Sequence, residues 1–195
     1  AHIPLILNPE GSKMSKRDQG ASLTTYMEGG YAPEAVVNYL YLLGWSPKEN
    51  REVMPLPEVI KMFDLPQILR HNARFDINKL HWVNGEYIRT MSQERFNRFA
   101  AEALKRDGIP VEGFAPEYIN AAFSTVKEKV KQFTEVNTFA HFYFLPEDEI
   151  EEISRKDLTA ENRRIMEAVR VALLNQDDFS VNSLNSITKK VAADL

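Results

Sequence analysis

The chain has no cysteine among its 195 residues, which excludes disulfide bonds and thiolate metal sites. Its four histidines, His2, His71, His81 and His141, lie far apart and form no His-x-x-x-His pair. We therefore expect no zinc site and no other metal site. No apolar run approaches the roughly 20 residues that span a bilayer, and no signal-peptide pattern opens the chain. Internal repeats and low-complexity tracts are also missing, so these absences predict a globular protein without membrane segments.

An excess of positive charge is missing as well, because 24 Lys and Arg stand against 28 Asp and Glu, for a formal net charge of −4. This balance argues against bulk adhesion to nucleic acid but allows a local basic face. Residues 61–98 carry seven Lys or Arg against four Asp or Glu, whereas residues 147–152 carry five acids and no base. A nucleic-acid surface is therefore expected in the first two thirds of the chain, and the acidic run is expected to be a solvated connector.

One short segment, residues 8–20, concentrates positive charge in the sequence Asn-Pro-Glu-Gly-Ser-Lys-Met-Ser-Lys-Arg-Asp-Gln-Gly. Its Asn-Pro and Gly-Ser pairs are typical of turns, so we predict a mobile loop. The lysines Lys13 and Lys16 can converge on a compact polyanion such as a triphosphate, with Ser15 donating a hydrogen bond and Arg17 adding a third cation. Taken alone, a basic pattern this short is more often a solvated turn.

The pattern around this loop is mainly helical. Residues 3–7 predict a short buried strand, and residues 75–77 predict a second extended piece. The first helices are predicted to begin at capping residues or prolines and to end at turn residues. We predict a helix capped by Ser22 and ended by Gly29-Gly30, one from Pro33 to Gly44, one from Pro57 to Asp64 with Val59, Ile60 and Phe63 inward, a helical turn over 67–70, and one carrying Leu80, Val83, Tyr87, Ile88 and Met91.

From Ser92 onward every predicted element is helical, and nothing there forms a catalytic constellation. We predict helices from Ser92 to Arg106, from Pro116 to Val130, over 139–145, from Thr159 with Ile165 inward, and from Ser180 to the end. Large aromatic side chains are usually buried, so Trp82 is expected to pack in the core.

The residues Lys13-Met14-Ser15-Lys16-Arg17 follow an apolar run and resemble the second signature of class I aminoacyl-tRNA synthetases, which is Lys-Met-Ser-Lys-Ser in its commonest form. Neighbouring segments narrow the resemblance to bacterial glutamyl-tRNA synthetases. These segments are Glu28–Ala35, Asn38–Leu40, Leu42–Pro47, Phe75–Gly85 and Tyr87–Arg89. The resemblance is strong over residues 2–91 and weaker from there to the end.

The resemblance implies a mainly α fold in three parts. Residues 1–20 would end the catalytic domain and carry the basic loop. Residues 21–91 would form a stem-contact domain with one or two short strands. Residues 92–195 would form an all-helical anticodon-binding region, a helix cage that is truncated at its C-terminal end. The Rossmann-like catalytic domain and its His-Ile-Gly-His signature are absent from these residues, so we expect a C-terminal fragment of a longer enzyme that is inactive alone.

The resemblance also implies the reaction of a glutamate–tRNA ligase. Glutamate and ATP, with Mg²⁺, give glutamyl-adenylate and pyrophosphate, and the glutamyl group then passes to the terminal ribose of tRNA(Glu). Lysines on a loop that closes as pyrophosphate leaves stabilise the transition state. Lys13 and Lys16 are the implied catalytic residues, and Lys13, Ser15, Lys16 and Arg17 are the implied contacts to the ATP phosphates. We expect a cytoplasmic monomer, with ATP and Mg²⁺ bound only when the missing catalytic domain is present.

Contacts to tRNA are implied for the later segments. Arg70, Arg74, Lys79 and Arg89 are candidates for phosphate contacts at the inner elbow of tRNA. His141 falls where some relatives use an arginine to read the third anticodon nucleotide. Phe139 and Tyr143 could stack on anticodon bases, but we expect both to pack in the core. Asp18 stands where many relatives have histidine, which puts contacts at that position in doubt.

Two other interpretations stay open. A helical protein-interaction module, or a general tRNA-binding module, could carry the basic loop incidentally. A glutaminyl-tRNA synthetase, or a short paralogue that glutamylates a tRNA base, would share the loop. The helical composition after residue 92 argues against both enzymes, because the first uses a β-barrel there and the second lacks an anticodon domain.

Overall fold

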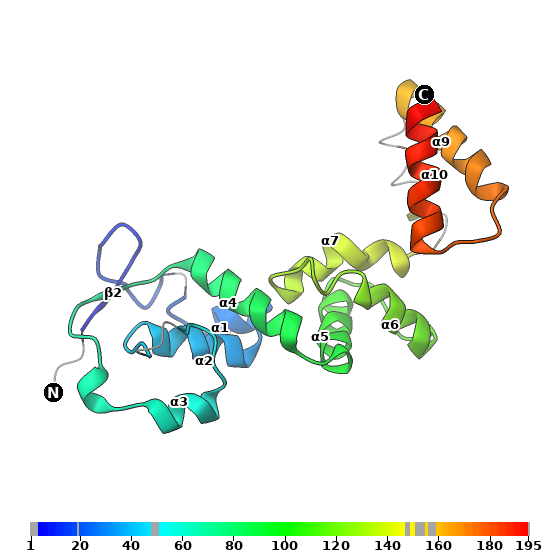
Figure 1. The fold of residues 1–195 in the computed structure, drawn as a ribbon. Coiled ribbons are helices and arrows are strands. Elements are labelled where there is room, and N and C mark those ends of the chain that lie inside the picture. The colour runs from blue at the N-terminus through cyan, green and yellow to red at the C-terminus, as the bar shows by residue number, and fades with distance from the viewer. Residues whose placement is uncertain are drawn as a thin grey trace. The chain divides into compact units, whose positions relative to one another are not determined.

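The computed structural model describes residues 4–18, 20–47, 51–146, 149–150, 155 and 159–194. The described residues are mainly helical with two short strands, which confirms the predicted fold class (Figure 1). The chain divides into two compact units, residues 1–144 and residues 145–195. Within the described residues, no helix is long and apolar enough to cross a membrane. The acidic connector predicted at 147–152 lies largely outside the described residues.

The two strands form a small parallel ribbon near the start of the first unit. Strand β1 (Ile6–Leu7) pairs with β2 (Ala73–Arg74), with Ile6 opposite Ala73 and Leu7 opposite Arg74. The prediction of a buried strand over 3–7 was wrong in length and burial, because Leu5 is 46% exposed and Ile6 is 38% exposed. A two-stranded ribbon carries no second layer by itself, so its outer face remains in solvent.

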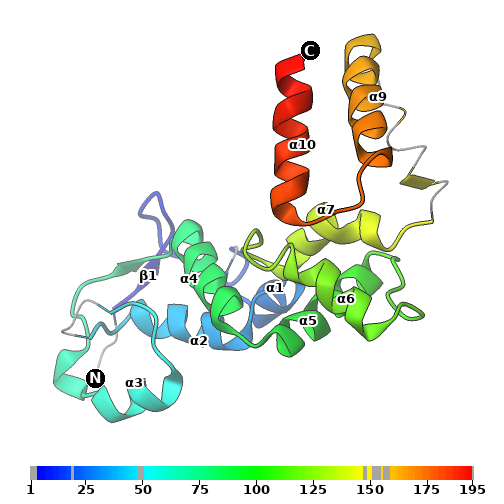
Figure 2. The same ribbon diagram turned by 45° about the vertical axis from the view of Figure 1, so that its right-hand side comes forward.

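The remaining elements of the first unit are helices. The α-helices are α1 (Leu23–Glu28), α2 (Pro33–Leu42), α3 (Leu56–Met62), α4 (Ile77–Thr90), α5 (Gln93–Arg106), α6 (Pro116–Ser124) and α7 (Val136–Ala140). The 3₁₀ helices are η1 (Leu65–Gln67), η2 (Phe133–Glu135) and η3 (His141–Tyr143). Figures 1 and 2 show α2 running beside α4, and the contacts between these helices agree.

The helix starts follow the predicted caps. The Ser22 hydroxyl accepts the Thr24 amide, and the Ser92 hydroxyl accepts the Arg95 amide, as their sequence positions indicated. Asp76 supplies a cap that sequence reasoning missed, because its carboxylate accepts the amides of the second and third residues of α4. This cap starts α4 at Ile77. The strand lies at 73–74, and within the extended piece predicted over 75–77 Asp76 is extended but Ile77 is already helical.

Three helix predictions were wrong in detail. The turn predicted over 67–70 lies at η1, and the helix predicted over 139–145 is split into α7 and η3. Helix α6 ends at Ser124 instead of Val130. The Thr125 hydroxyl donates to the Ala122 carbonyl, and the Val126 and Lys127 amides of the following turn donate to the Phe123 carbonyl. The apolar side chain of Val130 is nevertheless buried, although the residue lies outside the helix in which it was predicted.

Several side chains predicted to face inward are exposed. Ile60 and Phe63 of the α3 segment are 67% and 46% exposed, because this short helix buries Val59 against Trp45 and Met54 and leaves its other side in solvent. Trp82 on α4 is 44% exposed, which contradicts the predicted core packing. Its neighbours Val83 and Asn84 occupy the buried stripe of the same helix, so the indole falls on the opposite side.

Two main clusters make up the core of the first unit. The larger joins α4 to the helices that follow and centres on four phenylalanines, namely Phe96, Phe123, Phe133 and Phe144. The smaller lies beneath the basic loop and contains Tyr26, Val36, Tyr39, Phe75 and Leu80. Tyr39 meets Phe75 edge to face, with ring centroids 5.4 Å apart, which is a favourable aromatic geometry.

A buried asparagine ties α4 to segments on both sides of it. Asn84 is fully buried, its Oδ1 accepts the Ala32 amide at 2.8 Å, and its Nδ2 donates to the Lys131 carbonyl at 2.5 Å. Near Asn84, the Phe133 amide donates to the Gly30 carbonyl at 2.8 Å. The turn before α2 and the segment before η2 are therefore joined through one side chain, although about 100 residues separate them in sequence.

The second unit begins at Leu145. Its described helices, α9 (Ala160–Leu174) and α10 (Val181–Asp194), lie side by side in Figures 1 and 2. Thr159 caps α9 by accepting the Asn162 amide, and the Ser180 hydroxyl accepts the Ser183 amide, as predicted. The expected inward position of Ile165 was wrong, since it is 43% exposed. Among the described residues of these two helices Val191 alone is buried, because each helix packs against a single described neighbour.

Replacing Asn84 by Ala is expected to destabilise the first unit. The substitution leaves the buried Ala32 N–H without a partner, which costs about 1–3 kcal/mol, and removes the hydrogen bond to the partly buried Lys131 carbonyl. The free energy of unfolding, measured by urea denaturation followed by circular dichroism, should fall by about 1–3 kcal/mol. Asn78→Ala is the matched control, because Asn78 is an exposed asparagine on the same helix. Equal stability of the two variants would contradict the role assigned to Asn84.

Candidate functional site

The basic loop is a hairpin that continues from strand β1. The Asn8 amide donates to the Ser12 carbonyl at 2.8 Å, the Gly11 amide donates to the Asn8 carbonyl at 2.9 Å, and the Met14 amide returns to the Ile6 carbonyl at 3.0 Å. Gly11 adopts a φ of 96°, which the turn requires and which glycine adopts without strain. Residues 6–14 therefore form a closed turn that places Lys13 opposite Leu7.

Two residues of this segment fix the hairpin to the protein. Met14 is half-buried and packs against the smaller core cluster. Gly20 has a φ of 88°, and a Cβ atom built on it would lie 2.3 Å from the ring of Phe75. Tyr26 also donates its hydroxyl hydrogen to the Gly20 carbonyl. Sequence reasoning missed Met14 as an anchor, although an apolar residue between two lysines was a usable signal.

The three cations of the loop point into solvent. Lys13, Lys16 and Arg17 are exposed, and within the described residues none of the three forms an ion pair. The Ser15 hydroxyl accepts the Arg17 amide at 3.2 Å, so it shapes the turn that carries these cations. Three unpaired positive charges on one anchored turn form a site suited to a polyanion.

A single carboxylate stands inside this basic loop. Asp18 Oδ2 accepts the Ser15 amide at 2.7 Å and the Asn8 side-chain amide at 2.8 Å. These bonds favour the ionised carboxylate, so the pKa of Asp18 lies below its usual value, chiefly because of the Ser15 amide and then because of Asn8. Sequence analysis left the contacts of this residue in doubt, and the structure gives it two partners on separate arms of the loop.

An open cavity of about 530 Å³ lies between the loop and the start of α1. Lys13, Ser15 and Lys16 line it on one side, and Leu23 and Leu40 line it on another. The site therefore combines phosphate-binding chemistry with an exposed apolar wall. Within the described residues, no group of three or more His, Cys, Asp or Glu side chains could hold a metal ion.

The residues predicted to contact tRNA lie in different surroundings. Arg70 is exposed, and Arg74 is exposed beside the hairpin, with Nη1 3.5 Å from the Pro9 carbonyl. Lys79 pairs with Glu52 at 2.6 Å, and Arg89 pairs with Glu86 on the same helix. Arg74 therefore lies next to the basic loop.

His141 and its aromatic neighbours lie at the far end of the first unit. The Nδ1 atom of His141 lies 2.8 Å from the Asn137 carbonyl, which can only accept, so Nδ1 carries the hydrogen. Phe139 is 36% exposed and Phe142 is 44% exposed, which contradicts the core packing expected for Phe139. Tyr143 is half-buried against the larger core cluster, in line with the packing expected for it.

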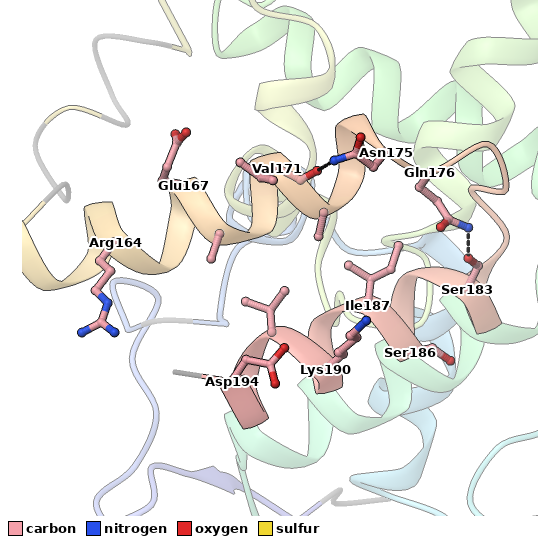
Figure 3. A pocket seen from close by; sticks show the side chains of 13 residues that line it. Arg164, Glu167, Val171, Asn175, Gln176, Ser183, Ser186, Ile187, Lys190 and Asp194 are labelled. Atoms are coloured by element: carbon pink, nitrogen blue, oxygen red, sulfur yellow. Dashed lines mark hydrogen bonds between the residues drawn. The ribbon is translucent and has the colours of Figure 1, made fainter.

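A second and larger cavity, of about 900 Å³, lies between α9 and α10 (Figure 3). Apolar side chains such as Val171 and Ile187 line it, and Gln176 donates to the Ser183 hydroxyl at 2.6 Å at one end. Arg164 and Asp194 add charges of both signs. None of the predicted site residues lines this cavity, so we place the candidate site at the basic loop.

Comparisons with known proteins identify the family of the chain. Residues 1–82 match a family model described as the catalytic domain of class I tRNA synthetases (E and Q), and residues 93–195 match an anticodon binding domain. The whole chain is 38% identical to glutamate–tRNA ligase 2 of Caldicellulosiruptor saccharolyticus and spans 41% of its length. The chain belongs to the glutamate–tRNA ligase family.

Two further relatives support the family assignment. The glutamate–tRNA ligase of Methylacidiphilum infernorum is 50% identical over 131 residues, which are 67% of the chain and 30% of that protein. A crystal structure of a glutamate tRNA ligase from Elizabethkingia meningosepticum, in complex with its amino acid, aligns with all of the chain at a TM-score of 0.75 and 30% identity. The chain covers 42% of that structure, and the resemblance stated from the sequence is thereby confirmed.

Replacing Gly20 by Ala is expected to disrupt the packing that anchors the basic loop. The positive φ alone strains a Cβ-bearing residue by about 1–2 kcal/mol, and the new methyl group must also displace the buried Phe75 ring. Gly108→Ala is the matched control, because Gly108 has a φ of 83° and nothing within 4 Å of its Cβ position. Urea denaturation should show a larger loss of stability for Gly20→Ala, and equal losses would rule out the close contact as the cause.

Proposed function

We propose that the chain is the tRNA-binding and ATP-loop portion of a cytoplasmic glutamate–tRNA ligase, which joins glutamate to tRNA(Glu) through glutamyl-adenylate. The observation that carries this proposal is the anchored hairpin with Lys13 and Lys16 exposed and unpaired within the described residues. Membership of the glutamate–tRNA ligase family supplies the reaction. The proposed division of the chain is a loop-bearing end of the catalytic domain over 1–20, a stem-contact domain over 21–91 and an anticodon-binding region over 92–195.

The loop would act on the phosphates of ATP during formation of the adenylate. As the bond between the α- and β-phosphates breaks, negative charge builds on the departing pyrophosphate. Lys13 and Lys16 would stabilise that charge, Arg17 would add a third cation, and Ser15 would hold the turn through the Arg17 amide. The enzyme uses ATP with Mg²⁺, but the described residues offer no ligand cluster for a metal ion. The role proposed for this chain in that step is to supply the cations of Lys13 and Lys16 to the phosphates.

The tRNA surface would begin beside the loop and continue along α4. Arg70 and Arg74 are exposed and are suited to bind phosphate oxygens. Lys79 and Arg89 pair with carboxylates at partly exposed positions, and such pairs contribute only about 0–1 kcal/mol, so a tRNA phosphate could replace the carboxylate. His141 would accept a hydrogen bond at Nε2 from an anticodon nucleotide, because its Nδ1 hydrogen is taken by Asn137.

The chain is expected to bind tRNA(Glu) in a salt-sensitive way. Fluorescence titrations with tRNA(Glu), tRNA(Gln) and an unrelated tRNA at two salt concentrations measure both affinity and the number of phosphate contacts. The double substitution Arg70→Ala/Arg74→Ala should weaken binding and reduce the salt slope by about 1 per lost contact. Lys61→Ala on α3 is the control for loss of one exposed charge.

The outcomes separate the possible functions. Preference for tRNA(Glu) would support the proposal, and equal binding of all three tRNAs would favour a general tRNA-binding module. Absence of binding at low salt would contradict the proposal and favour a protein-interaction module.

The isolated chain is expected to catalyse no ATP–pyrophosphate exchange. It supplies the loop cations but spans only 41% and 42% of the length of two of the relatives it matches. Exchange is measured with labelled pyrophosphate in the presence of glutamate and tRNA(Glu), with a complete glutamate–tRNA ligase as the positive control. Measurable exchange by the chain alone would show that the division of roles proposed here is wrong.

A further inference from the structure

Asp18 places a negative charge inside a loop whose other ionised side chains from residue 13 onward are cations. A carboxylate there repels a triphosphate, so a phosphate-binding role for the loop gives no electrostatic reason for its presence. Its hydrogen bonds give a different reason. One oxygen, Oδ2, accepts from the Ser15 amide at 2.7 Å and from the Asn8 side chain at 2.8 Å.

These two bonds connect separate turns of the loop. Asn8 belongs to the first turn, where its own amide donates to the Ser12 carbonyl at 2.8 Å and its side chain donates to the Ser12 hydroxyl at 3.1 Å. Ser15 begins the second turn, which the Asp18 amide closes by donating to the Ser15 carbonyl at 3.2 Å. Lys16 lies within the second turn, and Lys13 lies between the two turns.

We propose that Asp18 is a positioning residue that holds Lys13 and Lys16 in a fixed relation to each other. The proposal rests on the function proposed above, and it assigns to Asp18 no contact with substrate. The carboxylate acts through the Ser15 amide and the Asn8 side chain, and it keeps the two lysines directed at the same group of phosphate oxygens. Preorganised cations stabilise developing charge without reorganisation during the reaction, so loss of the carboxylate should slow the chemical step.

The direction in which the KM for ATP changes distinguishes a positioning residue from one that binds ATP directly. Asp18→Ala removes a repulsive charge, so the KM for ATP should stay the same or fall. Because the lysines lose their fixed relation, kcat for ATP–pyrophosphate exchange should fall by about 10- to 100-fold. Asp18→Asn keeps an oxygen that can accept both hydrogen bonds, so it should restore most of kcat while lacking the charge.

The kinetic experiment uses a full-length glutamate–tRNA ligase that carries this sequence. ATP–pyrophosphate exchange is measured for Asp18→Ala, Asp18→Asn, Asn8→Ala and Lys16→Ala. Glu10→Ala is the matched control, because Glu10 is a carboxylate of the same loop whose bonds lie within the first turn, to the Ser12 hydroxyl at 2.6 Å and toward Asn8, so kcat should fall much less than in Asp18→Ala. Hydrogen exchange of the Ser15 amide in the 195-residue chain tests the contact without catalysis.

The expected pattern is reduced kcat without a raised KM in Asp18→Ala and Asn8→Ala, rescue in Asp18→Asn, and faster exchange of the Ser15 amide in Asp18→Ala. Unchanged kcat in Asp18→Ala together with an inactive Lys16→Ala would overturn the positioning role and leave the proposed function intact. A raised KM with unchanged kcat would also overturn it, because it would place Asp18 in ground-state binding. Full activity of Lys16→Ala would instead contradict the proposed function, whatever the amide exchange shows.

Discussion

The buried amide of Asn84 is the contact on which the arrangement of the first unit depends. It accepts the Ala32 amide in a buried contact on one side and donates to the Lys131 carbonyl in a partly buried contact on the other. A buried polar group has few alternative partners, so this pair of bonds fixes the helix against both segments. The basic loop and residues 93–144 of the anticodon-binding match belong to the first unit, whereas the rest of that match lies in the second unit.

The basic loop is likewise held in shape by the contacts of a few residues. Its cations are free to meet a ligand because other atoms of the loop carry its structure. Met14 packs on the core, Gly20 allows the close approach of Phe75, and Asp18 joins the two turns. A loop that binds phosphate can therefore be exposed and still be ordered, which is what a site for developing charge requires.

Local features could be predicted well and tertiary features could not. The caps at Ser22, Ser92 and Thr159 were found because a cap involves only residues two or three apart in sequence. Burial at Trp82 and Ile165 was misjudged because apolar character does not say which side of a helix has a neighbour. The sequence pointed to Lys13 and Lys16 but gave no sign of the partners of Asp18, since those partners come together only when the hairpin closes.

The sequence by itself determined the family, the helical character and the identity of the loop, because each is recorded in short runs of residues. It also determined that no disulfide could help the fold, since cysteine is absent. Only the tertiary structure decided that residues 6–7 pair in parallel with residues 73–74, that Lys79 is held by Glu52, and that Asn84 connects three segments. These facts depend on contacts between residues far apart in the chain, or on which surface side chains meet, and no local pattern encodes them.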